Sequence, residues 1–126
     1  MATEMEDCTN ALATHVLDSF RDFGQRISEE EGVEDVSIHP LSKRDGFAST
    51  SLSFFRKGDS DDSSIEFTCT DTGGVVVSMF VTGAPVKELT APAILTREGV
   101  DAIVARFIST AFKRPEKPEA SLGPYD

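Results

Sequence analysis

The sequence contains no tryptophan, one tyrosine, two histidines and two cysteines, and its 12 basic residues are few beside its 22 acidic ones. The histidines and cysteines form no CxxC, HxxxH or HExxH motif, so the sequence predicts no zinc site. Glycine-rich phosphate-binding motifs are also absent, since Gly73 and Gly74 stand as an isolated pair between two predicted strands. No metal, nucleotide or other cofactor is therefore expected.

Long hydrophobic runs are missing as well. No apolar stretch approaches the roughly 20 residues that cross a bilayer. The first ten residues, MATEMEDCTN, are acidic, whereas a secretory or mitochondrial leader is basic. We therefore expect a folded protein that stays in the cytoplasm and has no membrane partner.

The two cysteines, Cys8 and Cys69, lie on the apolar faces of different predicted elements. Unbonded cysteine is among the most buried residue types, and disulfides are rare in the cytoplasm. Buried free thiols are the expected state of both residues. A disulfide between them is the alternative.

The formal net charge of -10 is concentrated near the N-terminus. Residues 1–39 carry ten acidic side chains against two basic ones, whereas residues 91–126 carry five of each. An acidic surface repels nucleic acid and anionic lipid, so a charged partner is expected to be a basic protein surface. The alternative is that the charge only keeps the protein soluble.

The 126 residues fit one domain, which we place at residues 1–114, followed by a disordered tail at 115–126. A first helix is predicted over about residues 4–30, with Gly24 inside it marking a bend or close packing. Its apolar residues recur every three or four positions and form one stripe, which predicts a buried face. They are Met5, Cys8, Leu12, Val16, Phe20, Phe23 and Ile27.

The pattern then changes to the alternation that is typical of strands. One strand is predicted before Pro40, and three more at residues 47–56, 64–71 and 75–82. Their connections are too short for parallel crossovers, so neighbouring strands are expected to be antiparallel. Residues 84–95 contain two prolines and are expected to form a loop, with a short edge strand at 86–89 as the alternative.

A second helix is predicted after Thr96, a good N-cap, and Pro115 ends it. Its apolar stripe consists of Val100, Ile103, Val104, Phe107, Ile108 and Ala111. The predicted fold is therefore a two-layer α+β domain: an N-terminal helix, a four-stranded antiparallel meander and a C-terminal helix, with both helices packed on one face of the sheet.

The other sheet face also carries apolar side chains, because Val76, Phe80, Phe47 and Phe55 alternate with the core residues of their strands. An exposed apolar face is typical of a binding site, so partner binding or homodimerisation through this face is a hypothesis. Alternatively, the proline-containing loop covers it, or the aromatics are ordinary surface residues.

The polar stretch between the second and third predicted strands, KGDSDDSSIEF, does not match a calcium-binding EF-hand loop. Ser64 and Thr70 replace the glycine and the bidentate glutamate that such a loop requires at positions 6 and 12. A solvated hairpin loop is expected, with weak calcium capture by Asp59, Asp61 and Asp62 as the alternative.

No set of convergent reactive groups is evident, so no enzyme is expected. Cys8 and His15 are seven helical residues apart, about 10 Å along the axis, which is too far for a direct thiolate–imidazole pair. His39 is expected at the end of a strand, at the surface rather than in a ligand set.

An acidic cluster is the best candidate for a binding site. It runs from the last turn of the first helix into the first strand and consists of Glu29, Glu30, Glu31, Glu34 and Asp35. Carboxylates at a helix C-terminus oppose the helix dipole, which makes selection by a partner a reasonable hypothesis. A solvated helix end is the alternative.

Taken together, these features favour a small acidic, non-enzymatic protein that binds or neutralises a basic protein surface, as immunity proteins, antitoxin-like inhibitors and secretion chaperones do. In size and acidity the chain is similar to the small secretion chaperones, but no helix is predicted between its strands, so no residue roles are carried over. The alternative is a small-ligand-binding module or enzyme with a pocket between the first helix and the sheet. That pocket would be lined by Phe20, Phe23, Phe54 and Phe67.

Overall fold

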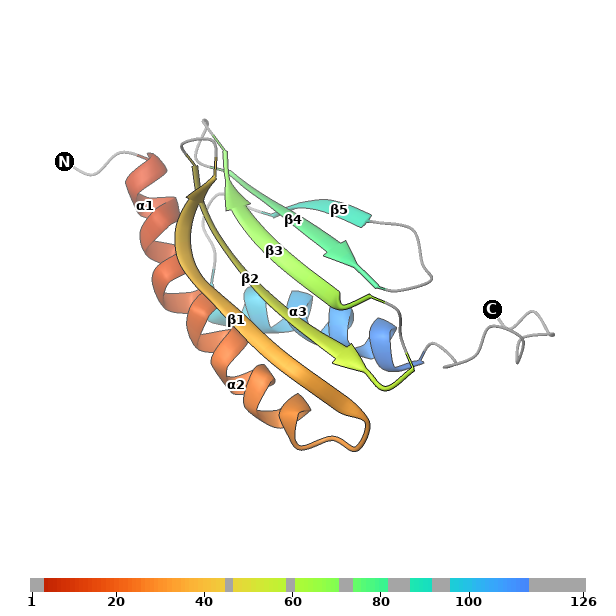
Figure 1. Ribbon diagram of the computed structural model, residues 1–126. Helices are drawn as coiled ribbons and strands as arrows, with labels where there is room; N and C mark the ends of the chain where they lie inside the picture. The colour runs from red at the N-terminus through yellow and green to blue at the C-terminus, as the bar shows by residue number, and fades with distance from the viewer. Residues whose placement is uncertain are drawn as a thin grey trace.

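The computed structural model describes residues 4–44, 47–58, 61–70, 74–81, 87–91 and 96–113. A long helical segment leads into an antiparallel sheet, and a last helix follows (Figure 1). In chain order the elements are α1 (Glu4–Ala11), the π-helix η1 (Leu12–Val16), α2 (Leu17–Ser28), β1 (Val33–Arg44), β2 (Phe47–Arg56), β3 (Ser63–Cys69), β4 (Val75–Phe80), β5 (Lys87–Ala91) and α3 (Arg97–Lys113).

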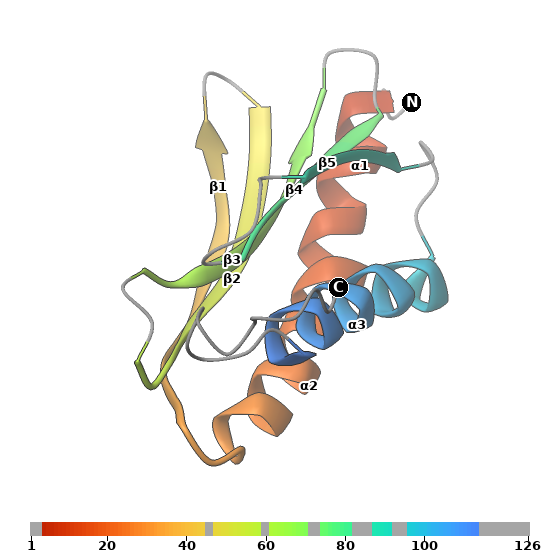
Figure 2. The ribbon, with the colours of Figure 1, turned by 90° about the vertical axis from the view of Figure 1, so that its right-hand side faces the viewer.

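The sheet has the simple order β1-β2-β3-β4-β5, and each strand is antiparallel to its neighbours. All the helices lie on one face of the twisted sheet, as Figures 1 and 2 show. The predicted two-layer α+β fold is confirmed. β5 adds a fifth strand to the expected four, so the expectation of a loop without a strand at 84–95 was wrong and the alternative, an edge strand near 86–89, is closer to the structure. We call the side that faces the helices the inner face and the opposite side the outer face.

The core lies between the inner face and the helices. Four phenylalanine rings from α2, β2, β3 and α3 form two edge-to-face pairs there. The ring centres of Phe20 and Phe67 are 5.8 Å apart, and those of Phe54 and Phe107 are 5.9 Å apart. Burying a side chain of this size stabilises the fold by about 1.5–3 kcal/mol. Phe20, Phe54 and Phe67, three of the four residues expected around a ligand pocket, are thus fully buried and packed in the core.

The first helix contains a π-helical segment, which the sequence analysis did not predict. Its buried residues Cys8, Leu12, Val16 and Phe20 recur every four positions. In an α-helix each step of four residues overshoots a full turn by about 40°, so three steps would rotate the stripe away from the sheet. The π-turn has i→i+5 hydrogen bonds and turns less per residue, which brings the stripe back onto the core.

Gly24 allows α2 to approach the sheet closely. A Cβ atom at this position would lie 3.4 Å from Ile38 Cδ1 and 3.6 Å from Leu52 Cδ1. Of the two expectations for this glycine, close packing is therefore confirmed. α2 continues through it as a regular helix to Ser28.

Both ends of α3 are held by hydrogen bonds. The backbone N–H of Gly99 donates to Thr96 Oγ1 at 3.0 Å, which confirms the predicted N-cap. At the other end, Arg56 Nη1 donates to the carbonyl of Ala111 at 2.7 Å, and its guanidinium lies 5.4 Å from the centre of the Phe112 ring. A cation at the C-terminal end of a helix interacts favourably with the helix dipole. Here the cation is Arg56, which belongs to β2.

α3 is also tied to α2 by a polar network. The hydroxyl of the buried Ser19 donates to Asp101 Oδ1 at 2.6 Å, and Arg97 Nε donates to the same carboxylate at 2.9 Å. Arg97 also pairs with Asp22 on α2. Burial raises the pKa of the Asp101 carboxyl, but the hydrogen bonds from Ser19 and Arg97 and the positive charges of Arg97 and Arg26 together lower it by more, so this pKa lies below its usual value.

The cysteines differ from the sequence-based expectation of free thiols, which was wrong. Cys8 on α1 and Cys69 on β3 form a disulfide, and each is only 1% exposed. Periodicity correctly placed both side chains on the core side, but it does not show that α1 crosses the sheet over β3. Because Cys8 is bonded, it also has no thiolate for a dyad with His15.

β1 continues past Pro40, where the predicted strand ended. The missing N–H of proline is tolerated because β1 is an edge strand. The pairing of β1 with β2 shifts twice, between Glu34 and Ser37 and again between His39 and Ser42. None of the helices in the described ranges is long and apolar enough to cross a membrane.

Candidate functional site

The outer face of the sheet is rich in hydroxyl groups. The strand register places polar residues beside one another in rows that cross the sheet. The central row is His39, Ser51, Glu66, Ser78 and Glu88; the rows on either side of it begin with Ser37, Ser53 and Ser64, and with Ser42, Ser49 and Thr68. The serine side chains among them are small, and hollows lie over this part of the sheet.

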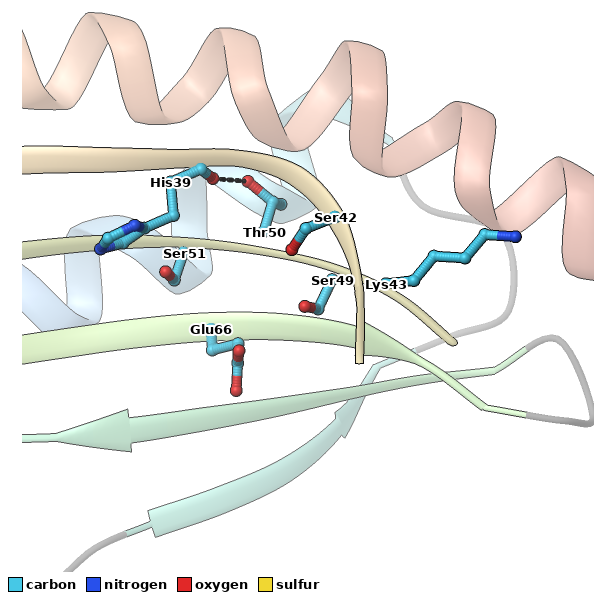
Figure 3. A pocket seen from close by; sticks show the side chains of 7 residues that line it. All are labelled: His39, Ser42, Lys43, Ser49, Thr50, Ser51 and Glu66. Atoms are coloured by element: carbon cyan, nitrogen blue, oxygen red, sulfur yellow. Dashed lines mark hydrogen bonds between the residues drawn. The ribbon is translucent and has the colours of Figure 1, made fainter. Parts of the chain in front are cut away.

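Two hollows of about 250 Å³ each lie on this face, over β1, β2 and β3. They share His39, Ser51 and Glu66, so they form one continuous depression, which we call the outer groove. The first hollow is also lined by Ser42, Lys43, Ser49 and Thr50, and the second by Ser53, Asp62 and Ser64. Figure 3 shows His39, Ser51 and Glu66 one after another across three strands, with Lys43 extending away from them.

Two serine hydroxyls in the floor of the outer groove have no hydrogen-bond partner within the described ranges. Ser49 is only 3% exposed and Ser53 only 7%. Neither hydroxyl makes a hydrogen bond to a residue that the structure describes. The Thr50 hydroxyl differs, because it donates to the backbone carbonyl of His39 at 2.7 Å and so ties β2 to β1 (Figure 3). Most side-chain polar groups with this degree of burial are paired, so these two serines have bonding capacity left for a ligand.

The charge in the outer groove is mainly negative. Asp62 lines one half of the groove, and Glu66 lies at the centre of the groove, where the two hollows meet. Glu88 lies on the same sheet row as Glu66. Lys43 is at the opposite end. The groove therefore has an acidic half that suits a cation.

Within the described residues, the outer groove brings together neither an activated nucleophile nor a set of metal ligands. His39 and Ser51 are cross-strand neighbours, yet no hydrogen bond joins the imidazole to the hydroxyl. Across the described ranges, no three histidine, cysteine or acidic side chains gather as metal ligands would. Of the expected weak calcium ligands, Asp61 is exposed, Asp62 lines the outer groove, and Asp59 falls outside the described residues.

The acidic junction, Glu29, Glu30, Glu31, Glu34 and Asp35, is exposed at all five positions. It lies where α2 turns into β1, with Gly32 at φ +87° in the turn. The Lys57 N–H donates to the Gly32 carbonyl at 2.7 Å, which ties this turn to the end of β2. Glu34 is the second residue of β1 and lies beside Phe55 of β2. The structure thus places the junction at the end of the sheet, close to the strand that forms one wall of the outer groove.

The four apolar residues expected on the second face are half-buried, and in the register each has a polar cross-strand neighbour. Val76 lies between Thr68 and Thr90, Phe80 beside Ser64, Phe55 beside Glu34, and Phe47 beside Arg44. Val76, Phe80 and Phe55 are therefore dispersed among polar side chains. The outer groove was not predicted from the sequence. The pattern that indicates it is the alternation of Ser49, Ser51 and Ser53 with the buried Leu52 and Phe54.

Comparisons of the chain with protein-family models, curated proteins and solved structures give no match. The functional interpretation therefore depends on the geometry and charge of the outer face and the acidic junction.

Proposed function

We propose that the protein is a small acidic binding protein that holds a basic surface of a partner protein and catalyses no reaction. The observation that carries the proposal is the exposure of all five acidic residues of the junction, which follow one another closely along the chain where α2 turns into β1. Immunity proteins, antitoxin-like inhibitors and secretion chaperones work in this general way, by covering part of another protein.

The acidic junction is costly for the isolated protein. Glu29, Glu30 and Glu31 follow the C-terminus of α2, where the dipole is negative, and each exposed carboxylate there costs a few tenths of a kcal/mol. Lysine and arginine side chains of a partner would neutralise these carboxylates and so remove their repulsion by the negative end of the helix dipole. They would also be attracted over a distance of about 10 Å at ordinary salt, which raises the association rate.

Affinity capture from the native source tests the proposal. The immobilised protein should retain a basic protein at low salt and release it at moderate salt, because the attraction between exposed charges is screened. The retained protein is then identified and purified, and its affinity is measured by calorimetry.

A pair of variants with equal charge changes provides the control. Glu30→Gln with Glu31→Gln should weaken binding of the purified partner, whereas Asp18→Asn with Glu98→Gln, on exposed helix positions, should change it little. If no basic protein is retained, the proposal is wrong. Equal weakening by the two pairs would show that only net charge matters, and it would remove the junction from the site.

A further inference from the structure

The two edges of the sheet are poorly suited to pairing with another strand. β1 is interrupted by Pro40, by two register shifts and by Asp35 at φ +50°. Such features keep an edge strand from adding a further strand. β5, at the other edge, is five residues long. A partner that binds the sheet is therefore expected to use its outer face.

The dimensions of the outer groove favour one side chain in each hollow. Its two connected hollows, of about 250 Å³ each, are shallow and open on the sheet face, unlike the enclosed pockets that bury most of the surface of a small ligand or cofactor. Its lining is also mostly polar, which does not suit an apolar ligand.

The lining groups match a cation that carries several hydrogen-bond donors. Asp62 and Glu66 supply negative charge. The hydroxyls of Ser49, Ser51 and Ser53, on the neighbouring strand β2, supply hydrogen-bond acceptors. A guanidinium offers five N–H donors in one plane, and an ammonium offers three. Binding either group would also satisfy Ser49 and Ser53, which are more than nine-tenths buried and have no partner among the described residues.

We infer that the outer groove binds an arginine or lysine side chain of the basic partner, with Asp62 and Glu66 as its charged contacts and the serines of β2 as its hydrogen-bond acceptors. The inference rests on the proposed function and names the place where the partner is recognised. The acidic junction then attracts the partner, and the outer groove holds one of its side chains.

A nona-arginine peptide is a suitable probe, with a nona-citrulline peptide as a neutral control of the same length and similar shape. Titration followed by ¹⁵N–¹H NMR should shift the amide signals of residues 49–53 and 62–66 with nona-arginine and leave them unchanged with nona-citrulline. Signals of α3, on the far side of the sheet, should not move.

Two variants separate the groove from general surface charge. Ser51→Leu fills the centre of the groove without changing any charge, and it should weaken nona-arginine binding about tenfold, the equivalent of about 1.4 kcal/mol. Asp62→Asn with Glu66→Gln should weaken binding more than Glu30→Gln with Glu31→Gln, although both pairs remove two negative charges. The dispersion of the core amide signals checks that each variant is folded, and if Ser51→Leu is not folded the two charge pairs decide alone.

The inference is overturned if folded Ser51→Leu binds nona-arginine as the wild type does, or if the two charge pairs have equal effects. In that case the proposed function still stands, provided that the capture experiment retains a basic protein. Conversely, occupation of the groove by nona-arginine without any retained protein would support the site and contradict the proposed function.

Discussion

Reduction of the disulfide between Cys8 and Cys69 should lower the free energy of unfolding by about 4 kcal/mol. The two cysteines are 61 positions apart in the sequence. The disulfide closes a loop of that length in the unfolded chain and so lowers its conformational entropy. Reduction restores this entropy, which stabilises the unfolded state by about 4 kcal/mol at 25 °C. Both residues are almost fully buried, so reduction leaves two small thiols in the same part of the core and removes little apolar packing. The effect therefore comes mainly from the cross-link.

Thermal unfolding followed by circular dichroism measures this effect. At about 4 °C for each kcal/mol, the midpoint should fall by about 15 °C when a reductant is added. Thiol titration of the unfolded protein shows whether the cysteines are disulfide-bonded or reduced. The double variant Cys8→Ala with Cys69→Ala is a control whose midpoint should not respond to the reductant. An unchanged midpoint after both thiols become titratable would refute the loop-closure reasoning. Two titratable thiols before reduction would refute the disulfide itself.

Two further predictions concern the contacts of α2. Gly24→Ala should raise the free energy of unfolding by about 0.5–1 kcal/mol, because alanine favours the helix and its Cβ would make ordinary contacts with Ile38 and Leu52; a loss of stability in urea unfolding would show that this contact is too close. Asp101→Asn should destabilise the protein at pH 7 by up to about 1 kcal/mol, since the pair with Arg97 is partly exposed. Because the folded-state pKa of Asp101 is lowered, this carboxylate stabilises the fold above the unfolded-state pKa of about 3.9, and the stabilisation disappears as the pH falls through the folded-state pKa. The difference in stability between the wild type and Asp101→Asn should therefore shrink below about pH 4, and a constant difference from pH 7 to pH 3 would contradict the assignment.

Most of the fold follows from patterns within single elements. The alternation in FASTSLSFFR predicted β2 with the bounds that the structure has, Phe47–Arg56. The apolar stripe of the second helix predicted the burial of Val100, Val104, Phe107 and Ala111, and Thr96 marked its start. These features depend on local periodicity and capping, which the sequence contains directly.

Some features were not predicted from the sequence, and all of them depend on contacts between distant segments. The disulfide requires that α1 crosses β3, and the outer groove requires that His39, Ser51 and Glu66 share one row on three strands. Register between strands depends on turns and twist, which a single chain pattern does not specify. Arg56 likewise caps α3 from 55 positions away, in a contact that only the packing of α3 against β2 creates.

The central claim, that carboxylates of the junction and the outer groove hold a basic protein, can be tested by zero-length cross-linking of the captured complex. A carbodiimide joins a carboxylate to a lysine amine only when the two are in contact, and mass spectrometry identifies the joined residues. We expect cross-links from the partner to Glu29–Asp35 and to Asp62 or Glu66, and we expect them to disappear at high salt. Cross-links confined to carboxylates of the helices, such as Asp18 and Glu98, would contradict the claim.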